Sequence, residues 1–177
     1  MKTQRTHAGF GGRTRKASLP ARAVACTLLA GALTVPDALA TSASGVVGEP
    51  IATGILPEAI RAKMKDEGGF GSGALVSDVA VVRFTIAPGG YFGWHRHGGP
   101  VWVVVEQGTL TLYDPDVAGC AQTYGPGSAF LDSGDHVHNA RNERATDVVV
   151  YGTFLLPQGG ALRVDAADPG TCLLPPL

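Results

Sequence analysis

The chain has 177 residues, of which 45% are hydrophobic and 16% are charged. Its 14 Lys and Arg residues nearly balance its 15 Asp and Glu residues, so the formal net charge is −1 at pH 7. This length suits a single domain. The charge balance excludes a strongly basic protein of the kind that binds nucleic acid through its overall charge.

The first 40 residues are predicted to form a secretory signal peptide. Basic residues open the segment, and they are followed by the apolar run 23–35, which is too short to span a bilayer as a helix. Ala38 and Ala40 are the small residues expected at positions −3 and −1 of a cleavage site. We therefore expect a secreted, extracellular protein whose mature chain begins at Thr41.

Removal of that segment changes the charge. Residues 41–177 contain 8 Lys and Arg residues against 14 Asp and Glu residues, a net charge of about −6. An acidic surface without basic clusters argues against nucleic acid, and against an anionic membrane, as a partner of the mature form. We expect a small-molecule substrate or ligand instead.

The mature chain is predicted to be all-β. Residues 41–74 are expected to lead into the domain, and 57–66 suits either a short helix or an entering strand. Within 75–156, strands are indicated by runs rich in Val, Thr, Ile and aromatic residues, bounded by Gly, Pro and Asp: 79–88, 101–107, 109–114 and 147–157. A tight hairpin is expected at 106–108. Short strands without an amphipathic helix between them favour an antiparallel sandwich or barrel.

Three histidines are the strongest candidates for a functional site. His95 and His97 are two residues apart, so on a strand their side chains point to the same face, whereas Trp94 and Arg96 point away. His138 follows in a later glycine-containing block. Three imidazoles suit a divalent transition metal, either Fe, Mn, Ni, Cu or Zn, and leave coordination positions open.

The two blocks resemble the two motifs of the cupin superfamily. In the first, Gly89, His95, His97 and Gly108 match; in the second, Gly127, His138 and Asn142 match, with Ser133 and Asp135 in place of a proline and a glycine. The run 93–100 also resembles the G-W-H-x-H-x-G-P signature of small secreted bacterial cupins. The resemblance implies a single-domain jelly-roll barrel over 75–156, and it allows a homodimer because cupins often pair through an outer strand.

The chain departs from the first motif at its glutamate, which is a metal ligand in many cupins and is Val101 here. Valine cannot donate an electron pair to a metal. His136 is a candidate extra ligand, although a solvated turn histidine is the favoured interpretation. The nearby carboxylates Asp132, Asp135 and Glu106 are expected to face solvent, which leaves no catalytic residue identified.

Two cysteines remain in the mature chain, Cys120 and Cys172. An even number in an exported protein predicts one disulfide, which would tether the C-terminal tail, residues 157–177, to the loop around Cys120. No strand or helix pattern is evident in that tail.

Three functional interpretations remain open. The first is a metal-dependent enzyme, dioxygenase-like or of the isomerase type, which acts on a small organic substrate in the barrel mouth. Aromatic residues are candidates for lining that mouth, although packing is their commoner role: Tyr91, Phe92, Trp102, Tyr113, Phe130 and Tyr151. Arg83 is a candidate partner for a substrate carboxylate, although an exposed strand arginine is favoured. The other two interpretations are a non-catalytic extracellular ligand-binding cupin and a structural barrel with a vestigial site.

Overall fold

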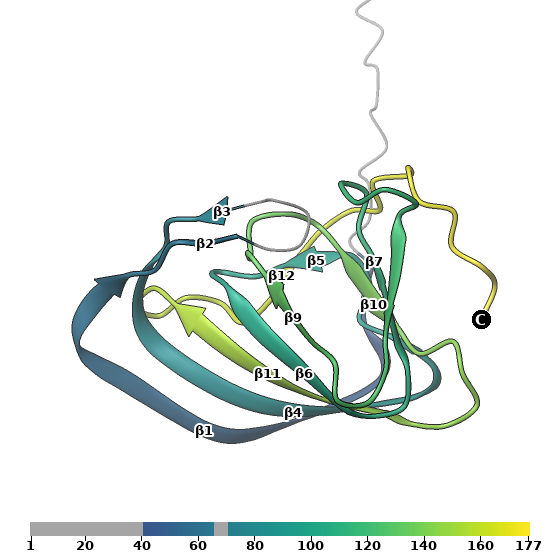
Figure 1. Ribbon diagram of the computed structural model, residues 1–177, viewed down its shortest axis with the longest axis horizontal. Helices are drawn as coiled ribbons and strands as arrows, with labels where there is room; N and C mark the ends of the chain where they lie inside the picture. Colours follow the sequence, from purple (N-terminus) through teal and green to yellow (C-terminus); the bar gives the residue numbers. More distant parts are fainter. Residues whose placement is uncertain (1–40, 66–70) are drawn as a thin grey trace, which may run out of the picture. The chain divides into compact units, whose positions relative to one another are not determined.

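A computed structural model describes residues 41–65 and 71–177 of the chain. The predicted signal peptide lies outside the described residues. The described part is built from strands, as the sequence predicts (Figure 1). No helix long and apolar enough to cross a membrane occurs in it. The strands are β1 (Ser44–Arg61), β2 (Met64–Lys65), β3 (Gly71–Ser72), β4 (Leu75–Tyr91), β5 (His95–Arg96), β6 (Val101–Gln107), β7 (Leu110–Tyr113), β8 (Ala121–Tyr124), β9 (Ala129–Asp132), β10 (Asn139–Arg141), β11 (Val148–Leu156) and β12 (Val164–Asp165).

One antiparallel sheet forms most of a barrel. Its strands follow the order β8-β7-β10-β4-β11-β6-β9, and β1 pairs with β4 outside this path. The two ends of the path meet through side chains, because the ring of Tyr124 in β8 stacks on that of Phe130 in β9 with centroids 4.3 Å apart. The result is a nearly closed barrel of antiparallel strands, which agrees with the predicted jelly-roll fold.

The period-two pattern of the long strands decides which side chains face inward. In β11, buried residues alternate with partly exposed ones from Val150 to Leu156. In β6, Val101 and Val105 are buried while Trp102 and Val104 remain exposed. Alternate residues of a strand point to opposite faces, so each of these strands gives one face to the interior and one to the outside. The interior faces form the two main hydrophobic clusters of the barrel.

Two details differ from the sequence predictions. Residues 57–61 continue β1, so the entering strand is correct and the short helix is not. Gly108, with φ of 76°, does turn the chain after β6. The strands on either side of it do not form a hairpin, however, because β6 pairs with β9 and β11 whereas β7 pairs with β8 and β10. The residue types at 106–108 indicate a turn, but tertiary packing determines which strands pair with each other.

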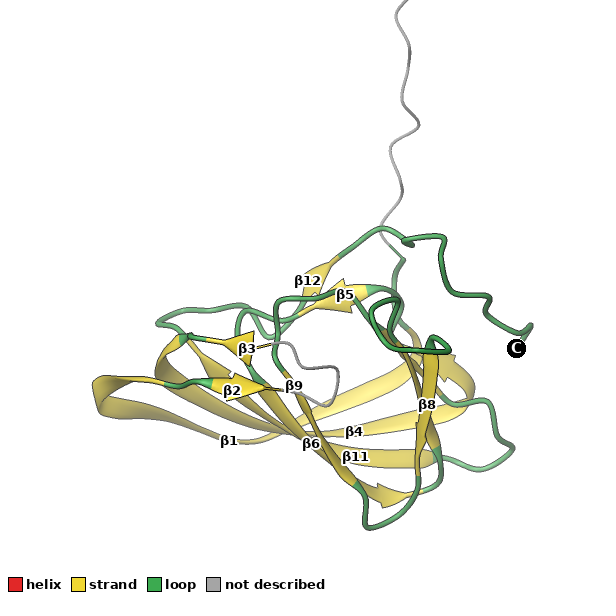
Figure 2. Cartoon of the chain, turned by 45° about the horizontal axis from the view of Figure 1, so that its top comes forward, coloured by secondary structure: helices red, strands yellow, loops and turns green. Residues whose placement is uncertain are grey.

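The C-terminal tail lies against the barrel. The tail contains the short strand β12, which the sequence did not predict, and β12 pairs with β5 (Figure 2). A disulfide joins Cys120 to Cys172, with the two Cα atoms 5.6 Å apart. Cys172 packs with Tyr113 and Trp94, which is only 1% exposed. The tail therefore covers Trp94, the residue that directly precedes β5.

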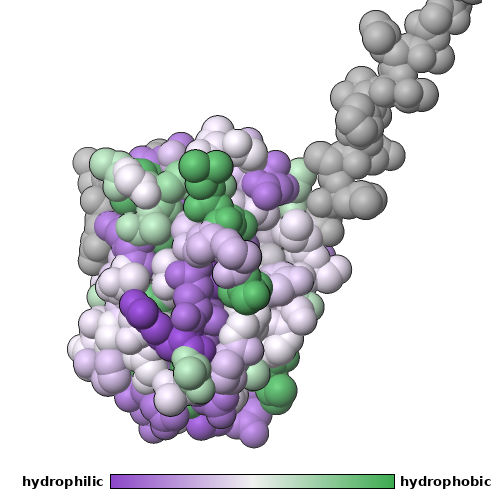
Figure 3. All heavy atoms as spheres, turned by 90° about the vertical axis from the view of Figure 1, so that its right-hand side faces the viewer, coloured by the Kyte–Doolittle hydropathy of each residue, from purple (hydrophilic) through white to green (hydrophobic). Residues whose placement is uncertain are grey.

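Large hydrophobic side chains also remain exposed. They belong mainly to β1 and β6 and include Val47, Ile51, Ile55, Trp102 and Val104. On the face seen in Figure 3, hydrophobic side chains form small separate groups among hydrophilic ones. That face therefore presents no single broad apolar patch.

Candidate metal centre

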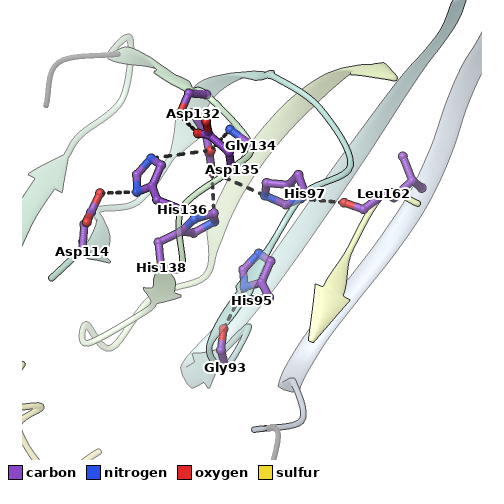
Figure 4. Close-up of polar contacts among 11 residues, drawn as sticks. Gly93, His95, His97, Asp114, Asp132, Gly134, Asp135, His136, His138 and Leu162 are labelled. Carbon is purple, nitrogen blue, oxygen red and sulfur yellow. Dashed lines mark hydrogen bonds and ion pairs between the residues drawn. The ribbon is translucent and has the colours of Figure 1, made fainter. Parts of the chain in front are cut away.

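The structure brings together the three histidines that the sequence selects. His95 is in β5, His97 follows that strand, and His138 directly precedes β10. The backbones of His95 and His138 exchange two hydrogen bonds, each with an N–O distance of 2.9 Å. One ring nitrogen of each histidine lies within 4.8 Å of the others (Figure 4). Residues far apart in the chain therefore form one cluster because β5 and the start of β10 are neighbours.

Backbone carbonyls orient two of the three rings. Nδ1 of His95 donates to the carbonyl of Gly93 at 2.8 Å, and Nδ1 of His97 donates to that of Leu162 at 2.6 Å. A proton on Nδ1 leaves the lone pair of a neutral imidazole on Nε2. A backbone carbonyl that accepts from one ring nitrogen, as at His95 and His97, is a usual partner of a metal-binding histidine, because it fixes the orientation of the ring.

Burial keeps these rings neutral. It is the main cause that lowers the pKa of His97 to about 4 from its ordinary 6.5, and the neighbouring His138 adds to the effect. Burial also lowers the pKa of His95, with further contributions from His138 and His97. A neutral imidazole does not have to lose a proton before it binds a metal. His95 and His97 are therefore suited to metal binding at neutral pH.

The histidines face a cavity of about 360 Å³. Most of its wall is apolar, and its polar side chains among the described residues are His95, His97, Asp132, His138 and Arg163. Apolar walls with a few convergent polar groups are typical of sites for small molecules. The cavity therefore has room for a small organic molecule beside the histidines.

The aromatic candidates divide between the cavity and other places. Phe92 and Phe130 line the cavity, together with Phe84 and Phe154, which the sequence did not single out. Trp102 is 47% exposed on the outer face of β6. Tyr91, Tyr113 and Tyr151 are absent from the lining, and Tyr113 packs with Trp94 instead. Inward and outward positions on a strand alternate, so aromatic character alone could not separate these residues.

Asp132 was expected to face solvent, and this expectation is wrong. The residue is 5% exposed and lines the cavity. Its Oδ2 atom lies 3.0 Å from Nε2 of His138 and 3.5 Å from Nε2 of His97. The sequence shows Asp132 at the start of a turn, but it is also the last residue of β9, where the side chain still points inward.

The other two carboxylates do face solvent. Asp135 is exposed, and the side chain of Glu106 is 53% exposed. Glu106 lies near Arg83, which also pairs with Glu49 at 3.1 Å. Arg83 is outside the cavity lining, so its role is that of a strand arginine on the outer face. Arg163 lines the cavity, and no motif in the sequence pointed to it.

His136 is neither solvated nor part of the histidine cluster. Its side chain is 12% exposed, and its Nδ1 lies 2.9 Å from Oδ2 of Asp114. Burial alone would raise the pKa of Asp114, but the interaction with His136 and the hydrogen bond from the amide of Asp116 outweigh it and lower that pKa. The expectation of a solvated turn histidine was therefore wrong. His136 joins Asp114 and Asp116 rather than the three histidines of the cavity.

Two further motif residues have structural roles. Val101 is 2% exposed and supplies an apolar part of the cavity wall. Asn142 is fully buried, and its Nδ2 donates to the carbonyls of Ile86 and Thr146, at 2.9 and 2.8 Å. It therefore holds the turn between β10 and β11 against β4.

Comparison with known families agrees with this fold. Residues 82–154 match the model of the cupin domain, Cupin_2. The chain therefore carries a cupin domain, and the three histidines lie within or beside the strands of that domain. No protein among the curated ones matches the sequence.

Solved structures of bacterial cupins are similar to part of the chain. The Cupin_2 domain of an XRE family transcriptional regulator from Enterobacter cloacae is 20% identical, with a TM-score of 0.43, over 64% of this chain and 99% of that one. A cupin domain from Bordetella pertussis is 24% identical, with a TM-score of 0.39, over 57% and 96%. A cupin superfamily protein from Desulfitobacterium hafniense is 11% identical, with a TM-score of 0.45, over 67% and 84%.

Proposed function

We propose that His95, His97 and His138 hold one divalent transition metal ion, either Fe, Mn, Ni, Cu or Zn, and that the protein acts on a small organic molecule bound beside it. The observation that carries this proposal is the orientation of the rings. In His95 and His97, Nδ1 donates a hydrogen bond to a backbone carbonyl, which leaves Nε2 for the metal. The donor set of neutral imidazoles suits all five ions, so it does not select one of them.

A bound ion would supply Lewis acidity and open coordination positions, which are the requirements of an oxygenase-like or isomerase-type reaction. The protein's own residues would do the rest. The phenylalanines of the wall, among them Phe92 and Phe154, would exclude water and hold an apolar substrate body. A non-catalytic ligand-binding cupin would need the same cavity. An enzyme would differ from it in converting the bound molecule to a product.

Metal titration tests the proposal. The metal-free mature protein is titrated with each of the five ions, together with His97→Ala and, as a matched control, His136→Ala. We expect stoichiometric binding in the wild type and the control, and a large loss of affinity in His97→Ala, because one of the three imidazole ligands would be removed. Equally weak binding by all three proteins would overturn the proposal in favour of a barrel with a vestigial site.

We also propose that the protein is exported. The signal-peptide pattern of residues 1–40 supports this, as does the disulfide between Cys120 and Cys172, because structural disulfides persist in oxidising compartments. N-terminal sequencing of protein recovered outside the cell tests the proposal.

A further inference from the structure

We infer that Asp132 is a fourth protein ligand of the metal centre and replaces the glutamate that the first cupin motif lacks at Val101. This inference rests on the proposed three-histidine centre. Val101 at the start of β6 and Asp132 at the end of β9 are directly paired residues of neighbouring strands. Both side chains are buried and line the cavity. A carboxylate therefore enters the cavity from the strand beside the one that carries the motif position.

The distances agree with shared coordination. Donor atoms that occupy adjacent positions on one ion, with bonds near 2.0 to 2.1 Å, lie about 2.8 to 3.4 Å apart. Oδ2 of Asp132 lies 3.0 Å from Nε2 of His138 and 3.5 Å from Nε2 of His97. On His97, Nε2 is the atom that the hydrogen bond of Nδ1 leaves for a metal. The same oxygen can thus bind an ion held between the two histidines with little movement.

The carboxylate is also held in this orientation. The backbone amide of Gly134 donates to its other oxygen, Oδ1, at 2.6 Å. Gly134 has φ of 92°, a conformation that glycine adopts readily, and this turn directs the amide back at Asp132. One oxygen is therefore fixed by the chain, while the other faces the histidines (Figure 4).

The negative charge of the Asp132 carboxylate favours a metal ion beside it. A buried carboxylate is stable when it is paired with a cation or coordinates one. Among the described residues, the groups within 4 Å of Asp132 that can carry positive charge are imidazoles, those of His97, His136 and His138. A divalent ion between the carboxylate and the histidines would supply the missing charge, and the carboxylate would lower the net charge of the centre.

The test compares Asp132→Asn with Asp135→Asn, which removes the same charge from an exposed position three residues away. Asparagine retains an oxygen that can accept from the amide of Gly134, so the turn is preserved. The double variant Asp132→Ala with Val101→Glu returns a carboxylate to the motif position. Metal-free proteins are titrated with Mn, Ni, Cu and Zn ions, the Cu(II) forms are compared by electron paramagnetic resonance, and thermal unfolding verifies the fold.

Loss of an outer-sphere partner costs about 10 to 100-fold in metal affinity, so loss of a ligand should cost more than about 100-fold. We expect that loss and a changed Cu(II) spectrum in Asp132→Asn, wild-type behaviour in Asp135→Asn, and recovery of most of the affinity in the double variant. A wild-type Cu(II) spectrum in Asp132→Asn would overturn the inference and leave the three-histidine centre intact. If the wild type binds no metal, the centre itself fails.

A separate observation concerns the ligand of the cavity. We infer that Arg163 binds the carboxylate of a small organic acid. Its guanidinium is held from two sides, because Nε donates to Asp165 at 2.5 Å and Nη2 donates to the carbonyl of Thr41 at 3.3 Å. The third nitrogen, Nη1, is buried and has no hydrogen-bond partner among the described residues. Arg163 lines the cavity, where the wall is otherwise mostly apolar.

These features define the class of molecule. A fixed guanidinium with a free N–H group is suited to a carboxylate, which can also take a second hydrogen bond from it. The phenylalanine-rich wall is suited to an aliphatic or aromatic body. The cavity of about 360 Å³ limits that body to a small molecule. A carboxylic acid with a short apolar part meets all three conditions.

Binding is measured by NMR titration of the metal-free protein, so that the result does not depend on the metal centre. Benzoate and hexanoate are compared with benzamide and hexanamide, which have the same shape without the charge. Arg163→Gln and Arg163→Lys are compared with Arg144→Gln, a matched control at an exposed arginine.

We expect the acids to bind about 10 to 100-fold more tightly than the amides, as a charge-assisted hydrogen bond would provide. Arg163→Gln should remove this preference, Arg163→Lys should retain part of it, and Arg144→Gln should retain all of it. Equal binding of acids and amides, unchanged preference in Arg163→Gln, or no binding of either acid at millimolar concentration would overturn the inference.

Discussion

Val101 and Asp132 face each other across β6 and β9, and their side chains contribute a methyl surface and a carboxylate to the same cavity wall. The first cupin motif has a glutamate where this chain has Val101. Because the two residues are paired, a carboxylate at either position reaches the same region. The cavity therefore keeps one acidic side chain although the motif position has lost it.

Val101→Glu alone should not strengthen metal binding by much. The new carboxylate would lie opposite Asp132 in a buried site, and two like charges there oppose each other. In the absence of Asp132 the same substitution should restore affinity. Titration of the single and double variants checks this non-additivity. Strong improvement in the single variant would show that Asp132 does not already serve the site.

His136→Ala should leave metal affinity unchanged and should lower the free energy of unfolding by about 1 to 3 kcal/mol, because it leaves the buried Asp114 without its imidazole partner. Chemical denaturation with and without the metal separates the two effects. Asp116→Asn, at an exposed position of the same loop, is the control. A large fall in metal affinity for His136→Ala would place this histidine in the metal centre after all.

The metal-free protein should become less stable as the pH falls from about 6.5 to about 4. The pKa of His97 is near 4 in the folded chain and near 6.5 when unfolded, so in this window the unfolded chain binds a proton that the folded chain does not. The slope for this one histidine is at most about 1.4 kcal/mol per pH unit. Above pH 6.5 the residue is neutral in both states and contributes no slope. Urea unfolding at several pH values, compared with His97→Gln, measures the difference.

Replacement of both Cys120 and Cys172 by Ser should lower stability by about 2 to 5 kcal/mol. It should also loosen the tail over Trp94, which is 1% exposed, whereas Trp102 is already 47% exposed. In a Trp102→Phe background the fluorescence therefore reports on Trp94 alone. We expect a red shift of its emission when the disulfide is absent. Unchanged emission would mean that strand β12 and the core contacts hold the tail without the disulfide.

Processing after Ala40 should give a mature chain that begins at Thr41. Two hydrogen bonds fix Thr41 in the structure. Its hydroxyl accepts from the amide of Trp94 at 2.5 Å, and its carbonyl accepts from Arg163. N-terminal sequencing and intact mass of the exported protein check the position. An intact Met1 in exported material would contradict the prediction.

The sequence by itself determined the fold class and the three histidines. Runs rich in Val, Thr and aromatic residues, such as 147–157, indicate strands because these residue types favour the extended conformation locally. The spacing of His95 and His97 is also a local property. The paired cysteines are likewise visible in the sequence, since few partners are available to them.

Only the tertiary structure decided which residues share the cavity with the histidines. The pairing of β6 with β9 sets Asp132 opposite Val101, and no local pattern encodes that register. The same holds for Arg163, which reaches the cavity from the tail because β12 pairs with β5. His136 and His138 are two residues apart, yet one meets Asp114 and the other the cavity. Local propensity is short-ranged, whereas a site is assembled by strand pairing and burial over the whole barrel.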